Sequence, residues 1–96
     1  MFMLELSFTK PATQVEPENK AHGERVRRYL GEGVFVFAGV KKGGTGGVLA
    51  VKSIEREALD RILAEDSYIK ADVGEYDIVE FDTKLTLPEF ESLKTL

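Results

Sequence analysis

The stretch from residue 34 to residue 51 constrains the fold of this chain more than any other part of the sequence. Residues 34–40 read VFVFAGV, a nearly continuous apolar run rich in β-branched and aromatic side chains, and residues 48–51 read VLAV. The intervening residues 41–47 read KKGGTGG, and so many glycines destabilise any regular element. The pattern predicts two strands joined as an antiparallel hairpin, with residues 34–40 as a buried central strand.

Two further elements are predicted ahead of this hairpin. Residues 2–8 alternate loosely between apolar and polar types until Thr9-Lys10-Pro11 ends the run, as expected for a first strand. From residue 15 to residue 31 the apolar side chains recur at helical spacing, with Val26 and Tyr29 on one side. This spacing predicts a first helix over 15–31, which ends at a glycine.

Two elements are predicted after the hairpin. Ser53 is a good N-cap, and behind it apolar side chains four residues apart predict a second helix. These side chains are Ala58, Leu59, Ile62 and Leu63. Asp66-Ser67 ends this helix, and residues 76–82 alternate as a fourth strand would. The apolar tail, residues 84–96, is expected to pack on its own domain or on a partner subunit.

The resulting order of strand, helix, strand, strand, helix, strand is the split βαβ arrangement of the ferredoxin-like fold, which is of the α+β class. Right-handed crossovers place the first and third strands side by side, so both helices cover one face of a four-stranded antiparallel sheet. The other face has no cover of its own. We predict a single domain over residues 1–96, and the simplest cover for its bare face is the same face of a second copy, as a homodimer.

Composition argues against several classes of partner and chemistry. The formal net charge is −4, and the basic residues form no long run that could follow a phosphate backbone, so nucleic acid is not expected as a partner. No apolar stretch approaches the roughly 20 residues of a membrane span, and no signal-peptide pattern is present, so we expect a cytoplasmic protein. The chain has no cysteine and one histidine, which excludes thiolate chemistry and a multi-histidine metal site within one chain. No motif indicates a cofactor.

The single histidine, His22, lies four and seven residues before Val26 and Tyr29, on the apolar side of the first predicted helix. This position is compatible with two roles, a hydrogen-bonded structural residue or a group that transfers protons. Asp66 likewise has two interpretations, a solvated or turn-forming residue and a partner of a functional group. Tyr29 and Tyr68 are candidates for a substrate pocket, and aromatic residues at such positions also belong to cores.

The spacing of this histidine and two glycines carries a resemblance to a known family. His22 is followed after eleven residues by Gly33 and after seventeen by Gly39, with an apolar run between the glycines. Residues 64–68, AEDSY, are similar to the Asp-Pro-Phe/Tyr segment that follows the second helix in the YciI-like family. Over roughly residues 2–85 the chain resembles this family, which belongs to the dimeric α/β-barrel superfamily of ferredoxin-like proteins.

The resemblance implies a function and a pair of site residues. In the family, the histidine of the first helix and the aspartate after the second are regarded as an active-site pair, and the matching residues here are His22 and Asp66. Such a pair implies an acid–base enzyme of lyase or isomerase type that acts on a small organic molecule, similar to dehydrochlorinases and muconolactone-isomerase-like proteins. The alternative is a noncatalytic dimeric module that binds a metabolite or a protein partner.

The chain departs from the family pattern at three positions. Asn19 stands where an arginine is common, which removes an anion-binding group. Val40 and Ser67 stand where prolines are common, which alters local chain stiffness more than chemistry.

Two other groups of residues invite functional interpretations. The backbone amides and lysines of residues 41–47 could cradle a phosphate, but the stretch lacks the Gly-Lys-Ser/Thr ending and the following helix of a P-loop, which favours a mobile hairpin tip. Arg25, Arg27 and Arg28 form a basic cluster among acidic neighbours, which favours a solvated face of mixed charge.

Overall fold

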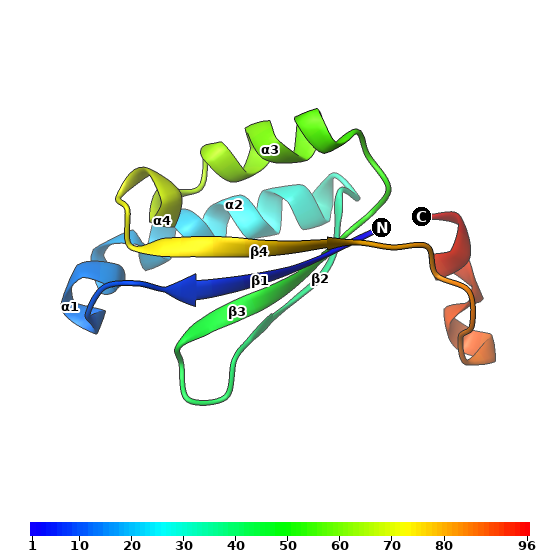
Figure 1. The fold of residues 1–96 in the computed structure, drawn as a ribbon, viewed down its shortest axis with the longest axis horizontal. Coiled ribbons are helices and arrows are strands. Elements are labelled where there is room, and N and C mark those ends of the chain that lie inside the picture. Colours follow the sequence, from blue (N-terminus) through cyan, green and yellow to red (C-terminus); the bar gives the residue numbers. More distant parts are fainter.

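The computed structural model describes residues 1–96 as a four-stranded sheet with helices on one of its faces (Figure 1). The strands are β1 (Phe2–Phe8), β2 (Phe35–Val40), β3 (Gly46–Val51) and β4 (Gly74–Glu80). The helices are α1 (Ala12–Val15), α2 (Asn19–Gly31), α3 (Arg56–Ala64) and α4 (Ser67–Lys70), and 3₁₀ segments span Glu16–Glu18 and Pro88–Thr95. The strands match their predicted ranges to within two residues.

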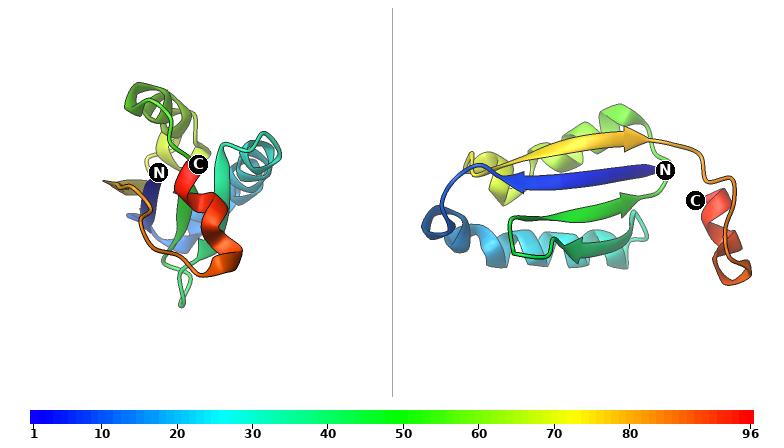
Figure 2. Two further views of the ribbon diagram at one scale, coloured as in Figure 1. Left: turned by 90° about the vertical axis from the view of Figure 1, so that its right-hand side faces the viewer. Right: turned by 60° about the horizontal axis from the view of Figure 1, so that its bottom comes forward.

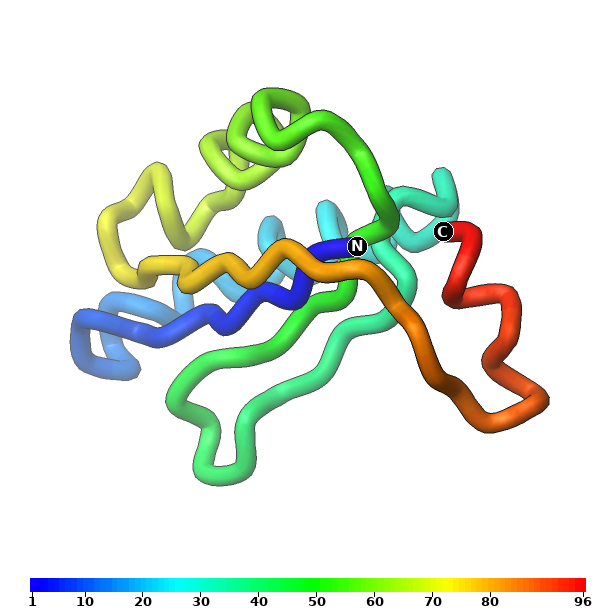
Figure 3. Tube along the Cα trace, turned by 45° about the vertical axis from the view of Figure 1, so that its right-hand side comes forward, coloured from blue at the N-terminus to red at the C-terminus, as the bar shows by residue number.

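The strand order confirms the predicted ferredoxin-like fold. The sheet runs β2-β3-β1-β4, and each pair of neighbours is antiparallel. The first and third strands are adjacent, and α2 and α3 lie on the same face of the sheet (Figure 2). The tail leaves the end of β4 and lies beyond the end of the sheet at which the chain begins (Figure 3). No α-helix lies on the opposite face of the sheet (Figure 2), and the 3₁₀ tail borders one end of that face at a hollow lined by Met3, Phe37 and Ala50.

The prediction of a buried central strand at residues 34–40 is wrong. β2 is an edge strand that pairs only with β3, and Val40 at its end is 81% exposed. Its apolar side chains are divided between the two faces of the sheet. Phe35 is buried in the core under the helices, whereas Phe37 pairs with Ala50 and lines the open face. Because both faces of β2 are apolar, its sequence resembles that of a central strand although only one face is covered.

Both long helices begin later than predicted. The first starts at Asn19, four residues late, because Pro17 lacks the N–H group that a continuous helix needs and a 3₁₀ turn forms there instead. The second starts at Arg56, and the residue before it is the N-cap. Ser53 is therefore not the N-cap that its position predicts. Its hydroxyl oxygen instead accepts a hydrogen bond from the nitrogen of Met1 (2.9 Å).

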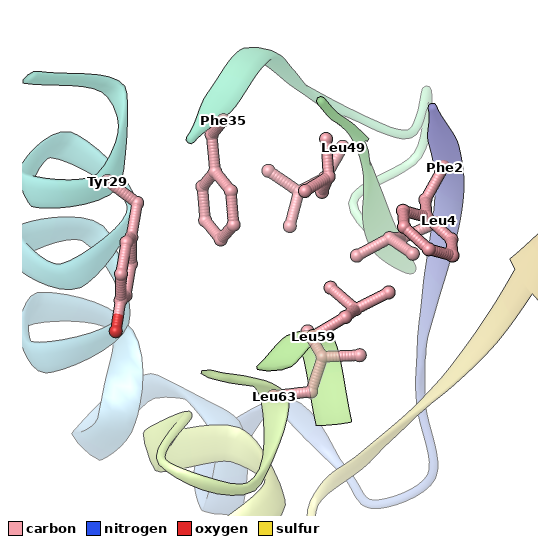
Figure 4. Close-up of a cluster of buried hydrophobic side chains, with 8 residues drawn as sticks. Phe2, Leu4, Tyr29, Phe35, Leu49, Leu59 and Leu63 are labelled. Atoms are coloured by element: carbon pink, nitrogen blue, oxygen red, sulfur yellow. The ribbon is translucent and has the colours of Figure 1, made fainter. Parts of the chain in front are cut away.

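The main core lies between the helix-covered face of the sheet and the helices α2 and α3 (Figure 4). It consists of Phe2, Leu4, Tyr29, Phe35, Leu49, Val51, Leu59 and Leu63. A second cluster, Leu6, Val15, Tyr68 and Val73, packs at the α4 end of the sheet. This second cluster packs α4 against β1 and α1.

Candidate functional site

Two side chains far apart in the sequence meet where α2 approaches α4. His22 is on α2, and Asp66 directly precedes α4 as its N-cap. His22 Nδ1 lies 2.8 Å from Oδ1 and 3.0 Å from Oδ2 of Asp66. Asp66 Oδ1 also accepts a hydrogen bond from the backbone N–H of Tyr68 (3.0 Å), as N-cap side chains do. The structure thus brings together the two residues that the family resemblance selects, and Asp66 is a local cap as well.

A third donor to Asp66 comes from β4, and sequence analysis did not single it out. The hydroxyl group of Tyr76 donates a hydrogen bond to Oδ2 of Asp66. Tyr76 pairs with Leu6 of β1, and this register places its side chain on the helix-covered face. The alternation in residues 76–82 signals which side chains face the helices. It does not signal which of them reaches Asp66, because this depends on where α4 packs.

The hydrogen-bond donors around Asp66 determine its charge. Asp66 is 1% exposed, and burial alone would raise the pKa of its carboxyl group. Hydrogen bonds from His22, Tyr76 and the backbone of Tyr68, with the charge of His22, outweigh burial and lower this pKa below its ordinary value. An ionised carboxylate only accepts hydrogen bonds, so Nδ1 of His22 carries the proton that lies between them. Nε2 is the ring nitrogen that remains without a partner in the chain.

The two tyrosines near Asp66 are held in their protonated form. Burial raises the pKa of the Tyr76 hydroxyl, and the negative charge of Asp66 and the hydrogen bond to it raise this pKa further. Burial also raises the pKa of Tyr68, and so do the charges of Asp66 and Glu18. The Tyr68 hydroxyl donates a hydrogen bond to Oδ1 of Asn19 (2.5 Å). Both hydroxyl groups therefore act as donors that stiffen the surroundings of His22.

A hollow of about 320 Å³ opens beside His22. The ring of Tyr68 stacks on the imidazole, with ring centroids 4.2 Å apart and an angle of 26° between the planes. The remaining wall is mostly apolar side chains and glycines, among them Leu6, Phe8, Val40, Gly44, Gly46 and Gly47. The glycine-rich hairpin therefore borders the candidate site.

A second hollow of about 230 Å³ lies between α2 and the edge strand β2 and shares His22 with the first. Its lining is largely apolar and includes Val26, Ala38 and Leu49. Arg27 is the one arginine or lysine that lines it. His22 therefore lies at the junction of the two hollows, which together form a groove along α2.

Tyr29 lies apart from both hollows. It is 7% exposed and belongs to the main core, where its ring lies between α2 and the ring of Phe35 (Figure 4). Its hydroxyl group donates a hydrogen bond to Oε2 of Glu65 (3.3 Å). Tyr29 is on the same face of α2 as His22 but lies about 10 Å further along the helix axis, because seven residues separate the two. Of the side chains predicted for the site, His22, Asp66 and Tyr68 come together and Tyr29 does not.

A comparison with protein families matches this chain to the YCII-related domain over residues 1–82. The chain belongs to the YCII-related family. The resemblance to YciI-like proteins, which rested on His22, the two glycines after it and the segment around Asp66, is thereby confirmed. In a separate comparison, none of the curated proteins matched the sequence.

A solved structure with the same fold as this YCII-related domain is the 5-chloro-2-hydroxyhydroquinone dehydrochlorinase from Burkholderia phenoliruptrix AC1100, in complex with 2,5-dihydroxybenzoquinone. The TM-score is 0.70, and the alignment covers 88% of this chain and 96% of that chain. The two sequences are 14% identical, so the likeness shows a shared fold and no more.

Three further observations concern the YCII-related domain as a whole. No group of three or more histidine and acidic side chains is arranged to hold a metal ion. No helix combines the length and the apolar character that crossing a bilayer requires. The family match ends at residue 82, so the tail at residues 84–96 lies outside it.

Proposed function

We propose that this YCII-related domain is a small acid–base enzyme, of lyase or isomerase type, that acts on a small organic molecule bound beside His22. One observation carries the proposal: His22 Nδ1 lies 2.8 Å from a buried carboxylate, while the same ring lines the hollow. A histidine held in this way has one nitrogen committed to its partner and the other available to a ligand.

The proposed roles follow from the hydrogen bonds. Asp66 accepts the Nδ1–H bond, which fixes the tautomer and the orientation of the ring. Nε2 then accepts a proton from the substrate, and the charge that develops on the ring is stabilised by Asp66 and by the stacked face of Tyr68. The protonated ring returns its proton to a different atom of the substrate in an isomerisation, or to a leaving group in an elimination. A positioned general base of this kind accelerates a reaction by about 10²–10⁴.

The size and lining of the hollow support a ring-sized ligand. Its volume of about 320 Å³ is near the lower end for small-molecule sites, which also combine apolar walls with a few polar groups. The dehydrochlorinase of the same fold was solved with 2,5-dihydroxybenzoquinone, a molecule of this size class. We propose a small oxygenated or aromatic molecule as the substrate.

Nitrogen NMR of the single histidine tests this proposal. We expect the neutral ring of His22 to be protonated at Nδ1 and bare at Nε2, because the Asp66 carboxylate accepts the Nδ1–H bond. In Asp66→Asn this preference should weaken, and in Glu65→Gln, which alters the neighbouring carboxylate, it should persist. A wild-type ring protonated at Nε2 would rule out the proposed base and would favour the noncatalytic binding module.

We also propose that the domain forms a homodimer through the open face of its sheet. Phe37 on β2 and Val79 on β4 are 48% and 60% exposed, and they mark the two ends of one row across this face whose inner members are Ala50 and Met3. A symmetric contact between two such faces would bury them. A cytoplasmic location for the protein also stays a prediction.

The tail provides a test of the dimer. It encloses an apolar hollow of about 300 Å³ against the open face, yet Leu85, Leu87 and Phe90 remain 92%, 60% and 50% exposed. Deletion of residues 85–96 should lower the melting temperature by roughly 5 °C or more. It should also change the mass measured by light scattering from that of a dimer to that of a monomer. A full-length variant with Leu87, Phe90 and Leu93 changed to serine should behave like the deletion. Unchanged size and melting in both variants would remove this role for the tail.

A further inference from the structure

The three arginines of α2 differ in what holds their guanidinium groups. Arg28 donates a hydrogen bond from Nε to Oε2 of Glu32 (2.9 Å). Arg25 is 13% exposed, lies 3.7 Å from Glu65 and packs over the ring of Tyr29. Arg27 makes neither an ion pair nor a side-chain hydrogen bond within the chain. Its charge is therefore available to a ligand.

Arg27 also occupies a different place from its neighbours, because it lines the hollow that it shares with His22. Gly23 lies one turn before it, and a Cβ atom added there would be 3.3 Å from Nη1 of Arg27. The guanidinium group thus lies close to the helix surface over a residue with no side chain. The glycine provides room for the guanidinium group of Arg27 beside the groove, at a residue about 7.5 Å further along the helix axis than His22.

The charge of the groove is opposite to that of the chain as a whole. The chain has 17 acidic and 13 basic side chains, but neither hollow beside His22 is lined by an aspartate or a glutamate. Its polar side chains are those of Asn19, Tyr68, His22 and Arg27, and the rest of the lining is apolar or glycine. An unpaired guanidinium group in such surroundings favours an anion, and its planar fork matches a carboxylate in particular.

We propose that the groove takes a small, flat organic anion, with its carboxylate or similar group paired to Arg27 and its apolar body against Val40 beside His22. This inference rests on the proposed function for the position of the ligand and adds the class of substrate. Arg27 is then a specificity-determining residue, which binds the substrate but takes no part in the proton transfer.

Binding of benzoate and of its neutral analogue benzamide to the ¹⁵N-labelled full chain tests the proposal. Benzoate should shift the signals of the His22 ring, and benzamide should bind at least about fivefold more weakly. In Arg27→Gln the dissociation constant for benzoate should rise about fivefold or more, whereas that for benzamide should not change. Arg61→Gln is the matched control, because Arg61 is an exposed arginine of α3 without an ion pair and its loss changes the net charge equally. Benzoate binding should survive this control substitution.

Three results would overturn the inference: equal affinity for the two probes, the same loss of benzoate binding in Arg27→Gln and Arg61→Gln, or no shift with either probe. The tautomer of His22 is read from the same samples. A ring protonated at Nδ1 without any preference for benzoate would reject the anionic substrate and leave the acid–base proposal standing. A ring protonated at Nε2 with an Arg27-dependent preference for benzoate would reject the acid–base proposal and leave an anion-binding module.

Discussion

Replacing Asp66 with asparagine is expected to lower the free energy of unfolding at pH 7 by about 2–4 kcal/mol. The carboxylate is 1% exposed and accepts hydrogen bonds from His22, Tyr76 and the backbone of Tyr68. An asparagine of the same size offers one acceptor oxygen and presents an NH₂ group to donors, so at least one buried donor loses its partner. Urea denaturation followed by circular dichroism measures the loss.

The same variant should remove part of the acid sensitivity of the fold. Because the pKa of Asp66 is lowered in the folded state, its contribution to stability is present above the unfolded pKa of about 3.9 and is lost as the pH falls through the folded pKa. The difference in stability between the wild type and Asp66→Asn should therefore shrink as the pH falls below about 4.

Asp72→Asn is the control for this substitution. The Asp72 side chain is 92% exposed, and its backbone has a φ of 55°, a conformation that asparagine tolerates well. We expect a loss within about 0.5 kcal/mol at any pH. Equal losses in the two variants, or a wild-type advantage over Asp66→Asn that is the same at pH 7 and pH 3, would show that the buried hydrogen bonds do not matter as described.

Sequence patterns predicted the fold well because the two long helices each have one dominant apolar face and the residues of β1 alternate loosely between apolar and polar types. The same logic failed for β2, whose two apolar faces serve different purposes: Phe35 fills the core, and Phe37 lies on the open face. Apolar content shows that a side chain avoids water. It does not show whether the cover comes from the same chain, so an edge strand with two apolar faces resembles a central strand.

The candidate site was only partly predictable. His22 and Asp66 are 44 residues apart, and no local spacing indicates that they meet; the family resemblance selected them. Tyr76 escaped notice because its role depends on the register of β4 beside β1 and on the packing of α4. Arg27 is exposed, as the interpretation of a solvated face predicts, but its position at the hollow depends on how α2 crosses the edge strand.

Three elements supply the donors that meet at Asp66, so these hydrogen bonds also hold the three elements together. His22 comes from α2, the backbone N–H of Tyr68 from α4, and the hydroxyl of Tyr76 from β4. A change in the packing of any of these elements would move a donor. The geometry of the groove therefore depends on the packing of all three elements, and on the hairpin that borders the hollow.

Replacing Gly46 with alanine is expected to lower the free energy of unfolding by about 3 kcal/mol or more, which a domain of this size barely tolerates. Gly46 pairs with Ser7 at the start of β3, and a Cβ atom there would lie 1.9 Å from the carbonyl oxygen of Leu6. No rotamer relieves this contact, because both atoms are fixed to the backbone. The strands β1 and β3 would have to separate, and with them the wall of the hollow beside His22.

Gly39→Ala distinguishes this clash from a general effect of alanine in the hairpin. Gly39 lies in β2 across from Val48, and an added Cβ atom would be 3.4 Å from a Val48 methyl group, which is ordinary contact. This variant should keep its denaturation midpoint, or gain slightly, because alanine restricts the unfolded chain. Gly46→Ala could instead have the same denaturation midpoint and the same His22 ring signal as Gly39→Ala. In that case β1 and β3 would not be as close as the structure places them, and the wall of the hollow beside His22 would be wrong.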